Sequence, residues 1–222
     1  MKKQSLLTQI AGYGLVPIVA RMCGIITAPI LTQSFSVSDY GIIDLLGSVV
    51  AALALLVAVN AVSGFYREFY DYDADTQKSL FSSLFWFYVI SSSVVVSFVI
   101  VFHDYLAFAI LENDGYSFLL LLALFKLPFI LMQEIAFALL RIKKDVFMYA
   151  FLSIAVALVN VVSVAFLYFF DLLIIENLLL LQLILALLAT CSAIFVIRSH
   201  ILFSFDFLCA DIRPFLNSQN NH

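Results

Sequence analysis

The blocks FMYAFLSIAVALVNVVSVAFLYFF (147–170) and LLIIENLLLLQLILALLATCSAIFVI (172–197) are apolar along nearly their whole length and are divided by one residue, Asp171. Each exceeds the roughly 20 residues that a helix needs to cross a bilayer. Blocks of this length are also too long for a buried core helix. The pair therefore predicts two membrane-spanning helices joined by a tight turn.

The same pattern extends along the chain. The 222 residues are 64% hydrophobic and 12% charged, with a mean hydropathy of +1.11, whereas a soluble domain of this size needs far more charge on its surface. Apolar blocks between polar breaks give six predicted spans: Gln9 to Leu31, Gly41 to Val62, Phe81 to Phe102, Tyr116 to Leu140, Phe147 to Phe170 and Leu172 to Ile197. We predict an all-α transmembrane bundle of six spans over residues 1–200, followed by a cytoplasmic tail at 201–222.

The positions of lysine and arginine orient these spans. The segments 32–40 and 103–115 and the turn at 171 contain acidic residues but neither lysine nor arginine. Nine of the 11 basic residues fall in the alternate segments: Lys2, Lys3, Arg67, Lys78, Arg141, Lys143, Lys144, Arg198 and Arg213. Because cytoplasmic loops carry the excess of basic residues, this distribution predicts that both termini are cytoplasmic.

The other two basic residues, Arg21 and Lys126, lie inside predicted spans. At about 1.5 Å per helical residue, both lie roughly 15 Å below the outer end of their span, and Asn160 and Gln182 fall near the same depth. A charge at this depth costs at least about 2.5–3.5 kcal/mol and marks a candidate functional site. Arg21 also lies on a stripe of small residues at helical spacing, formed by Gly14, Pro17, Gly24 and Ala28.

Two interpretations of these polar residues stay open. In the functional one, the two cations line a water-filled cavity that attracts an anionic substrate. In the structural one, they pair with Asp44 or Glu134 on tilted helices, or satisfy carbonyls freed by Pro17 and Pro128, while the two amides form hydrogen bonds between helices. The shared depth of both cations favours the cavity.

Other classes of function have no support in the sequence. The three histidines (His103, His200 and His222) are scattered, and neither a glycine-rich phosphate loop nor a nucleophile elbow occurs. The three cysteines lack metal-like spacing. A net charge of −4 without a basic cluster disfavours nucleic acid. We therefore expect no catalytic activity, no metal, no cofactor and no nucleic-acid partner.

Three stretches, taken in order, resemble a known family. They are TAPILTQSFSVSDYG (27–41), NAVSGFYREF (60–69) and LRIKKDVFMYA (140–150). They are similar to stretches of polysaccharide biosynthesis membrane proteins, the Wzx-type oligosaccharide flippases of the multidrug/oligosaccharidyl-lipid/polysaccharide exporter superfamily. Members of this family usually have about twelve or more spans, so the chain resembles their N-terminal lobe.

The resemblance implies a transporter in the bacterial inner (plasma) membrane whose two lobes enclose a cavity. Its substrate would be an undecaprenyl-diphosphate-linked oligosaccharide, an O-antigen or capsule repeat unit, moved from the inner to the outer leaflet. Arg21 and Lys126, with Asn160 and Gln182, would then bind this substrate, the two cations meeting the diphosphate. The partners would be membrane lipid and a second lobe or second copy. A truncated, non-transporting remnant or an assembly partner of polysaccharide biosynthesis is the alternative.

Overall fold

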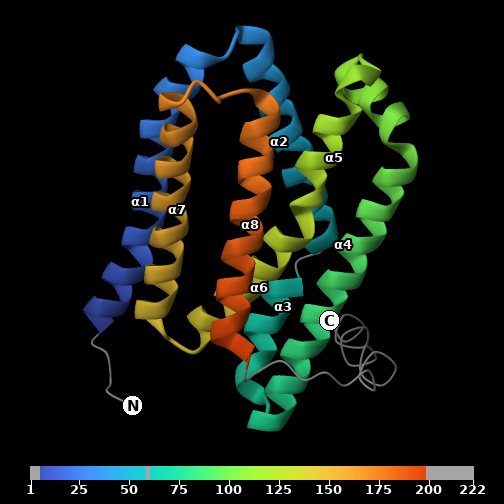
Figure 1. Ribbon diagram of the computed structural model, residues 1–222. Helices are drawn as coiled ribbons and strands as arrows, with labels where there is room; N and C mark the ends of the chain where they lie inside the picture. Colours follow the sequence, from blue (N-terminus) through green and yellow to red (C-terminus); the bar gives the residue numbers. More distant parts are fainter. Residues whose placement is uncertain (1–5, 59–60, 199–222) are drawn as a thin grey trace.

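The computed structural model describes residues 6–58 and 61–198, which form helices joined by turns, with no strand among them (Figure 1). The predicted all-α fold is therefore confirmed over these ranges. The tail predicted at 201–222 lies outside the described residues.

Six segments of the described chain are long and apolar enough to cross a membrane, the number predicted. The two helices α5 and α6 together make one of them, and the short α3 makes none. In chain order the elements are α1 (Leu6–Ser34), α2 (Val37–Ala58), α3 (Ala61–Glu68), the 3-10 helix η1 (Phe69–Asp71), α4 (Ala74–Leu111), the 3-10 helix η2 (Asp114–Tyr116), α5 (Ser117–Phe125), α6 (Leu127–Ile142), α7 (Val146–Phe169) and α8 (Ile175–Ile197).

Successive spans run in opposite directions, as the charge pattern requires. The connections at 35–36, 112–116 and 170–174 lie at one end of the bundle, and α3 and the turn at 143–145 lie at the other (Figure 1). We call the first the acidic end, because it carries Asp39, Glu112 and Asp171. The second is the basic end, which carries Lys143 and Lys144.

The second span begins four residues earlier than predicted, at Val37 rather than 41, because residues 36–39 form a capping box. The backbone N–H of Asp39 donates to the Ser36 hydroxyl at 3.1 Å, and the Ser36 N–H donates to an Asp39 carboxylate oxygen at 3.3 Å. These two bonds satisfy backbone donors that the first turn of α2 would otherwise leave free.

The third span is longer than predicted, and much of the loop predicted at 103–115 is helix. Helix α4 continues through a kink at Phe102 to Leu111, because residues 105–111 are again apolar. It ends where Glu112 adopts a left-handed conformation with φ 56°. With 38 residues, α4 measures about 57 Å and exceeds the roughly 30 Å hydrocarbon layer. A span of this length fits the layer only by tilting, by kinking as at Phe102, or by extending beyond it.

The loop predicted at 63–80 is also structured. Helix α3 and η1 occupy its first half, and Phe65 and Phe69 of these elements are buried. Their rings lie 5.2 Å apart, and Phe65 contacts Phe81 of α4 at 6.0 Å. Because aromatic residues anchor this segment to the bundle, it folds against the basic end instead of forming a free connection.

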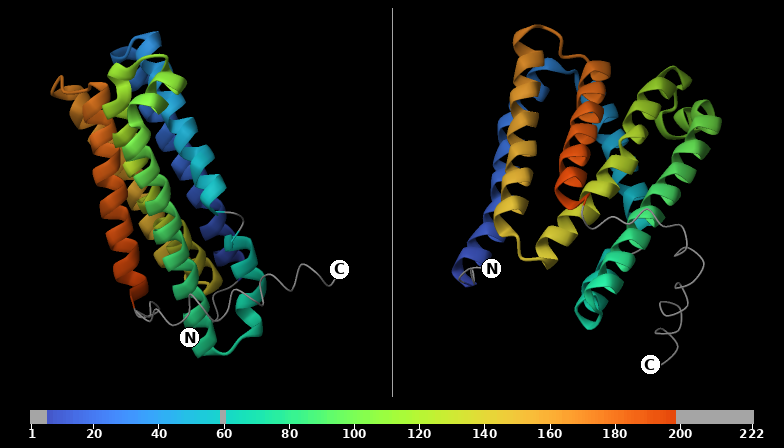
Figure 2. Two further views of the ribbon diagram at one scale, coloured as in Figure 1. Left: turned by 90° about the vertical axis from the view of Figure 1, so that its right-hand side faces the viewer. Right: turned by 60° about the horizontal axis from the view of Figure 1, so that its bottom comes forward.

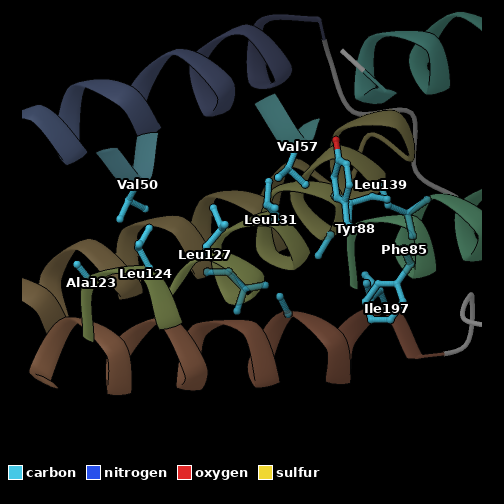
Figure 3. Packing of buried hydrophobic residues seen from close by; sticks show 14 of the residues in the cluster. Val50, Val57, Phe85, Tyr88, Ala123, Leu124, Leu127, Leu131, Leu139 and Ile197 are labelled. Atoms are coloured by element: carbon cyan, nitrogen blue, oxygen red, sulfur yellow. The ribbon is translucent and has the colours of Figure 1, made fainter. Parts of the chain in front are cut away.

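The core of the bundle is the span made by α5 and α6. This span packs against α2, α4 and α8, and its fully buried leucines recur at helical spacing, among them Leu120, Leu127, Leu131 and Leu139. Figure 3 shows several of these side chains pointing toward Val50 and Val57 of α2 and toward Tyr88 of α4.

Helices α1 and α7 form a pair beside this core. They lie against each other along their length, and α7 connects the pair to α8 and α6 (Figures 1 and 2). Helix α1 contacts α2 little, although the two follow each other in the chain.

Truncating the core should destabilise the bundle. Leu131→Ala removes a side chain that is 0% exposed and leaves a cavity, so we expect a loss of about 2 kcal/mol in the free energy of unfolding. The measurement is a detergent unfolding titration in mixed micelles. Leu55→Ala is the matched control, because Leu55 of α2 is 77% exposed, and it should change the free energy by less than about 0.5 kcal/mol.

The orientation can be tested by cysteine labelling in a cysteine-free background. We expect a membrane-impermeant maleimide to label Asp171→Cys in intact cells and spare Lys144→Cys, with the reverse result in inverted vesicles. The opposite pattern would show that the acidic end faces the cytoplasm.

Candidate functional site

Lys126 lies at the break between α5 and α6. It has helical dihedral angles (φ −76°, ψ −15°) but belongs to neither helix, and Pro128 follows at the start of α6. Proline has no backbone N–H, so it removes one bond of the helix ladder at this point. The break therefore has a local cause in the sequence, and it places a lysine where two helices meet.

The ammonium group of Lys126 is bonded to the next helix in space. Its Nζ donates to Oε1 of Gln182 on α8 at 2.8 Å, and both side chains are half-buried. This contact agrees with the common depth inferred for the two residues by counting along their spans. A charge-assisted bond of this kind is stronger than one between neutral groups, and here it holds α8 against the break.

A second bond joins α8 to α6, about two turns further along α8. The buried hydroxyl of Thr190 donates to the backbone carbonyl of Phe129 at 2.8 Å. Thr190 was missed in the sequence, although its position eight residues after Gln182 puts the two on one face of α8. The face of α8 that meets α5 and α6 is thus polar at two levels.

Arg21 occupies a different environment. The residues of α1 that are buried beside α7 are Val16 and Cys23, and Arg21 lies on the other side of the helix, exposed. Within the part of the chain that the structure describes, its guanidinium makes no hydrogen bond or ion pair. Neither the pairing with Asp44 or Glu134 nor the bond to a freed carbonyl, the two possibilities of the structural interpretation, is therefore formed by Arg21 there.

The small-residue stripe around Arg21 is open. Gly14 and Gly24 are exposed, and no atom of another element lies within 4 Å of the position that a Cβ would take at either glycine. Gly41 and Gly47 of the neighbouring α2 show the same open space. These glycines thus have no neighbour within the described residues, whereas large apolar side chains such as Ile18 and Ile25 are exposed beside Arg21.

The four candidate residues are therefore not assembled into one site. Lys126 and Gln182 meet between the core and α8, whereas Arg21 points outward from α1. Asn160 is half-buried on α7 and, among the residues described, has no side-chain hydrogen bond. The arrangement holds the Lys126 cation inside the bundle and presents the Arg21 cation on its surface.

Comparison with known protein families, with curated proteins and with solved structures gave no match. The fold and the polar residues together define a multi-pass helical membrane protein that carries cations within its spans.

The bond between Lys126 and Gln182 can be measured by a double-mutant cycle of Lys126→Met and Gln182→Leu. We expect a coupling energy of about 1 kcal/mol in the free energy of unfolding, the range of polar contacts between membrane helices. A parallel cycle of Lys126→Met with Asn160→Leu serves as the control, and its coupling should be close to zero. Equal coupling in both cycles would contradict the contact.

Proposed function

We propose that the chain forms one lobe of a flippase-type transporter in the bacterial inner membrane. Its substrate would be an undecaprenyl-diphosphate-linked oligosaccharide, an O-antigen or capsule repeat unit. Six alternating spans with cations in two of them support a transport role. The three stretches that resemble oligosaccharide flippases (27–41, 60–69 and 140–150) support this particular substrate.

The observation that carries the proposal is the exposed position of Arg21. An arginine about halfway along a span is costly when it faces lipid. This cost is avoided if the exposed side of α1 that carries Arg21 turns toward a water-filled passage between this lobe and a second lobe or second copy. Small residues at the margin of such a passage let a bulky ligand or another helix approach the backbone closely.

The other candidate residues would then have separate roles. Arg21 meets the diphosphate directly, because a guanidinium binds phosphate oxygens in a bidentate manner. Lys126 is already bonded to Gln182, so it contributes positive potential from within the lobe. Asn160 lies on α7, the partner of α1, where its amide is available to a sugar hydroxyl.

Complementation of a flippase-null strain tests the proposal, with surface polysaccharide as the measurement. We expect the full chain, with its second lobe supplied if one is required, to restore the polysaccharide. Arg21→Gln should lower the rescue about ten-fold or more, because a charge-assisted bond to phosphate is lost, whereas Arg21→Lys should retain part of it.

Arg198→Gln is the matched control, because Arg198 is an exposed arginine outside the spans that stacks on Phe195 at 4.5 Å. It should leave the rescue unchanged. If the wild-type chain is expressed, reaches the membrane and restores nothing, the alternative of a non-transporting remnant or assembly partner is favoured. Full rescue by Arg21→Gln would exclude the proposed contact with the diphosphate.

A further inference from the structure

A group of aromatic residues surrounds one arginine at the basic end of the bundle, far from the cations in the spans. An open pocket of about 320 Å³ is lined by Tyr13 of α1, Tyr66 of α3, Tyr70 of η1, and Arg141 and Ile142 at the end of α6. Four elements from three separate parts of the chain therefore converge on one arginine. We call this the tyrosine pocket.

The guanidinium of Arg141 is held in place. Its Nε donates to the carbonyl of Phe137 at 3.3 Å, and its central carbon lies 5.8 Å from the ring centre of Tyr66 and 5.6 Å from that of Tyr149. Two aromatic faces at this distance stabilise a cation. Because the described bond uses Nε, the two terminal amino groups of the guanidinium stay available to a ligand.

Two of the tyrosines fix the walls of the pocket. The Tyr13 hydroxyl donates to the Arg141 carbonyl at 3.3 Å, and the Tyr70 hydroxyl donates to the Ile142 carbonyl at 2.9 Å. Both carbonyls belong to the last turn of α6, and that of Arg141 also accepts from the Lys144 backbone N–H at 3.1 Å. The bonds hold α1 and η1 against the end of α6.

The third tyrosine supplies a hydroxyl without a partner. The oxygen of Tyr66 is buried and makes no hydrogen bond among the described residues, an arrangement that destabilises the folded state. Burial raises the pKa of Tyr66, and the opposing effect of the Arg141 charge is smaller. The phenol is therefore protonated at neutral pH and can donate to an anion.

Charges of both signs lie around the pocket, since Asp71 follows the pocket residue Tyr70 in the sequence. Lys143 follows the pocket residue Ile142, and its pKa is lowered by partial burial and by the nearby charge of Lys78. Two carboxylates also lie close enough to act electrostatically on the pocket. The charge of Asp145 acts on the phenol of Tyr13, and that of Glu134 helps to raise the pKa of Tyr66. The Asp145 carboxylate accepts from the Met148 backbone N–H at 3.3 Å as the cap of α7, so part of its capacity is used within the chain.

We infer that the tyrosine pocket binds a phosphate group, supplied either by an anionic phospholipid headgroup or by a soluble phosphate. The planar guanidinium of Arg141 matches two phosphate oxygens, and the free Tyr66 phenol adds a neutral donor. A bundle end rich in tyrosine and basic residues also lies at the level of phospholipid headgroups. This inference does not depend on the proposed transport, because the pocket contains none of the residues assigned to it.

The test uses the full chain purified in nanodiscs. One arm compares phosphatidylcholine discs with discs that also contain phosphatidylglycerol, and the second adds inorganic phosphate to phosphatidylcholine discs against chloride of equal ionic strength. The rise in melting temperature over a titration gives the apparent affinity in each arm. We expect Arg141→Gln to weaken binding about ten-fold or more and Arg198→Gln to leave it unchanged.

Tyr66→Phe separates binding from folding, because it keeps the ring beside Arg141 and removes the hydroxyl alone. We expect this variant to melt no lower than the wild type without phosphate, since a buried hydroxyl without a partner is removed, and to bind phosphate more weakly. A response in the lipid arm alone identifies a headgroup site, and a response to inorganic phosphate identifies a site for soluble phosphate as well.

Three results would overturn the inference. The first is no response in either arm. The second is an equal loss of affinity in Arg141→Gln and Arg198→Gln, which indicates attraction by the whole basic end. The third is unchanged affinity in Tyr66→Phe.

Discussion

Inside a bilayer no water is available to a backbone amide or a hydroxyl, and this constraint governs nearly every feature of the chain. The described spans are helical except at the kink at Phe102 and the break at Lys126, so most of their backbone groups bond internally. The polar side chains within them follow the same rule, since the hydroxyls of Ser91, Ser92 and Ser93 in α4 each donate to a carbonyl of the preceding turn. Beside Pro128, where the helical ladder is broken, α8 accepts a bond from Lys126 and donates one to the Phe129 carbonyl of α6. The core is thus held by apolar packing together with a few bonds that no solvent can replace.

The two cations in the spans meet this constraint in different ways. Lys126 has one hydrogen-bond partner within the bundle, because Gln182 lies at the same depth and faces it. Arg21 is not satisfied within the described residues, and the small residues around it leave the backbone accessible. Neither cation is paired with a carboxylate among the described residues, and only Lys126 has a polar partner on another helix. This asymmetry was hidden in the sequence, where the two residues looked equivalent.

Hydropathy and charge were sufficient to predict the number of spans and their alternation, because both depend on properties counted along the chain. They were not sufficient for the extent of α4, since His103 and Asp104 interrupt an apolar run that the helix continues through. Lateral packing was also out of reach. Spans that are apolar on all sides give no periodic signal for their neighbours, so neither the pairing of α1 with α7 nor the direction of Arg21 could be inferred. The tyrosine pocket was missed for a related reason, because its members come from four segments and meet only when the basic end has folded.

The bonds from Tyr13 and Tyr70 to the last carbonyls of α6 have a mechanical consequence. Helix α1 contacts its sequence neighbour α2 little, and it lies instead along α7. The Tyr13 hydroxyl therefore acts as a tether between the α1–α7 pair and the core. Any rocking of that pair that widens the basic end must break this bond and the ring contact between Tyr149 of α7 and Phe137 of α6, whereas rocking about the basic end leaves both in place. Tyr13 and Tyr149 thus couple the α1–α7 pair to α6 at the basic end.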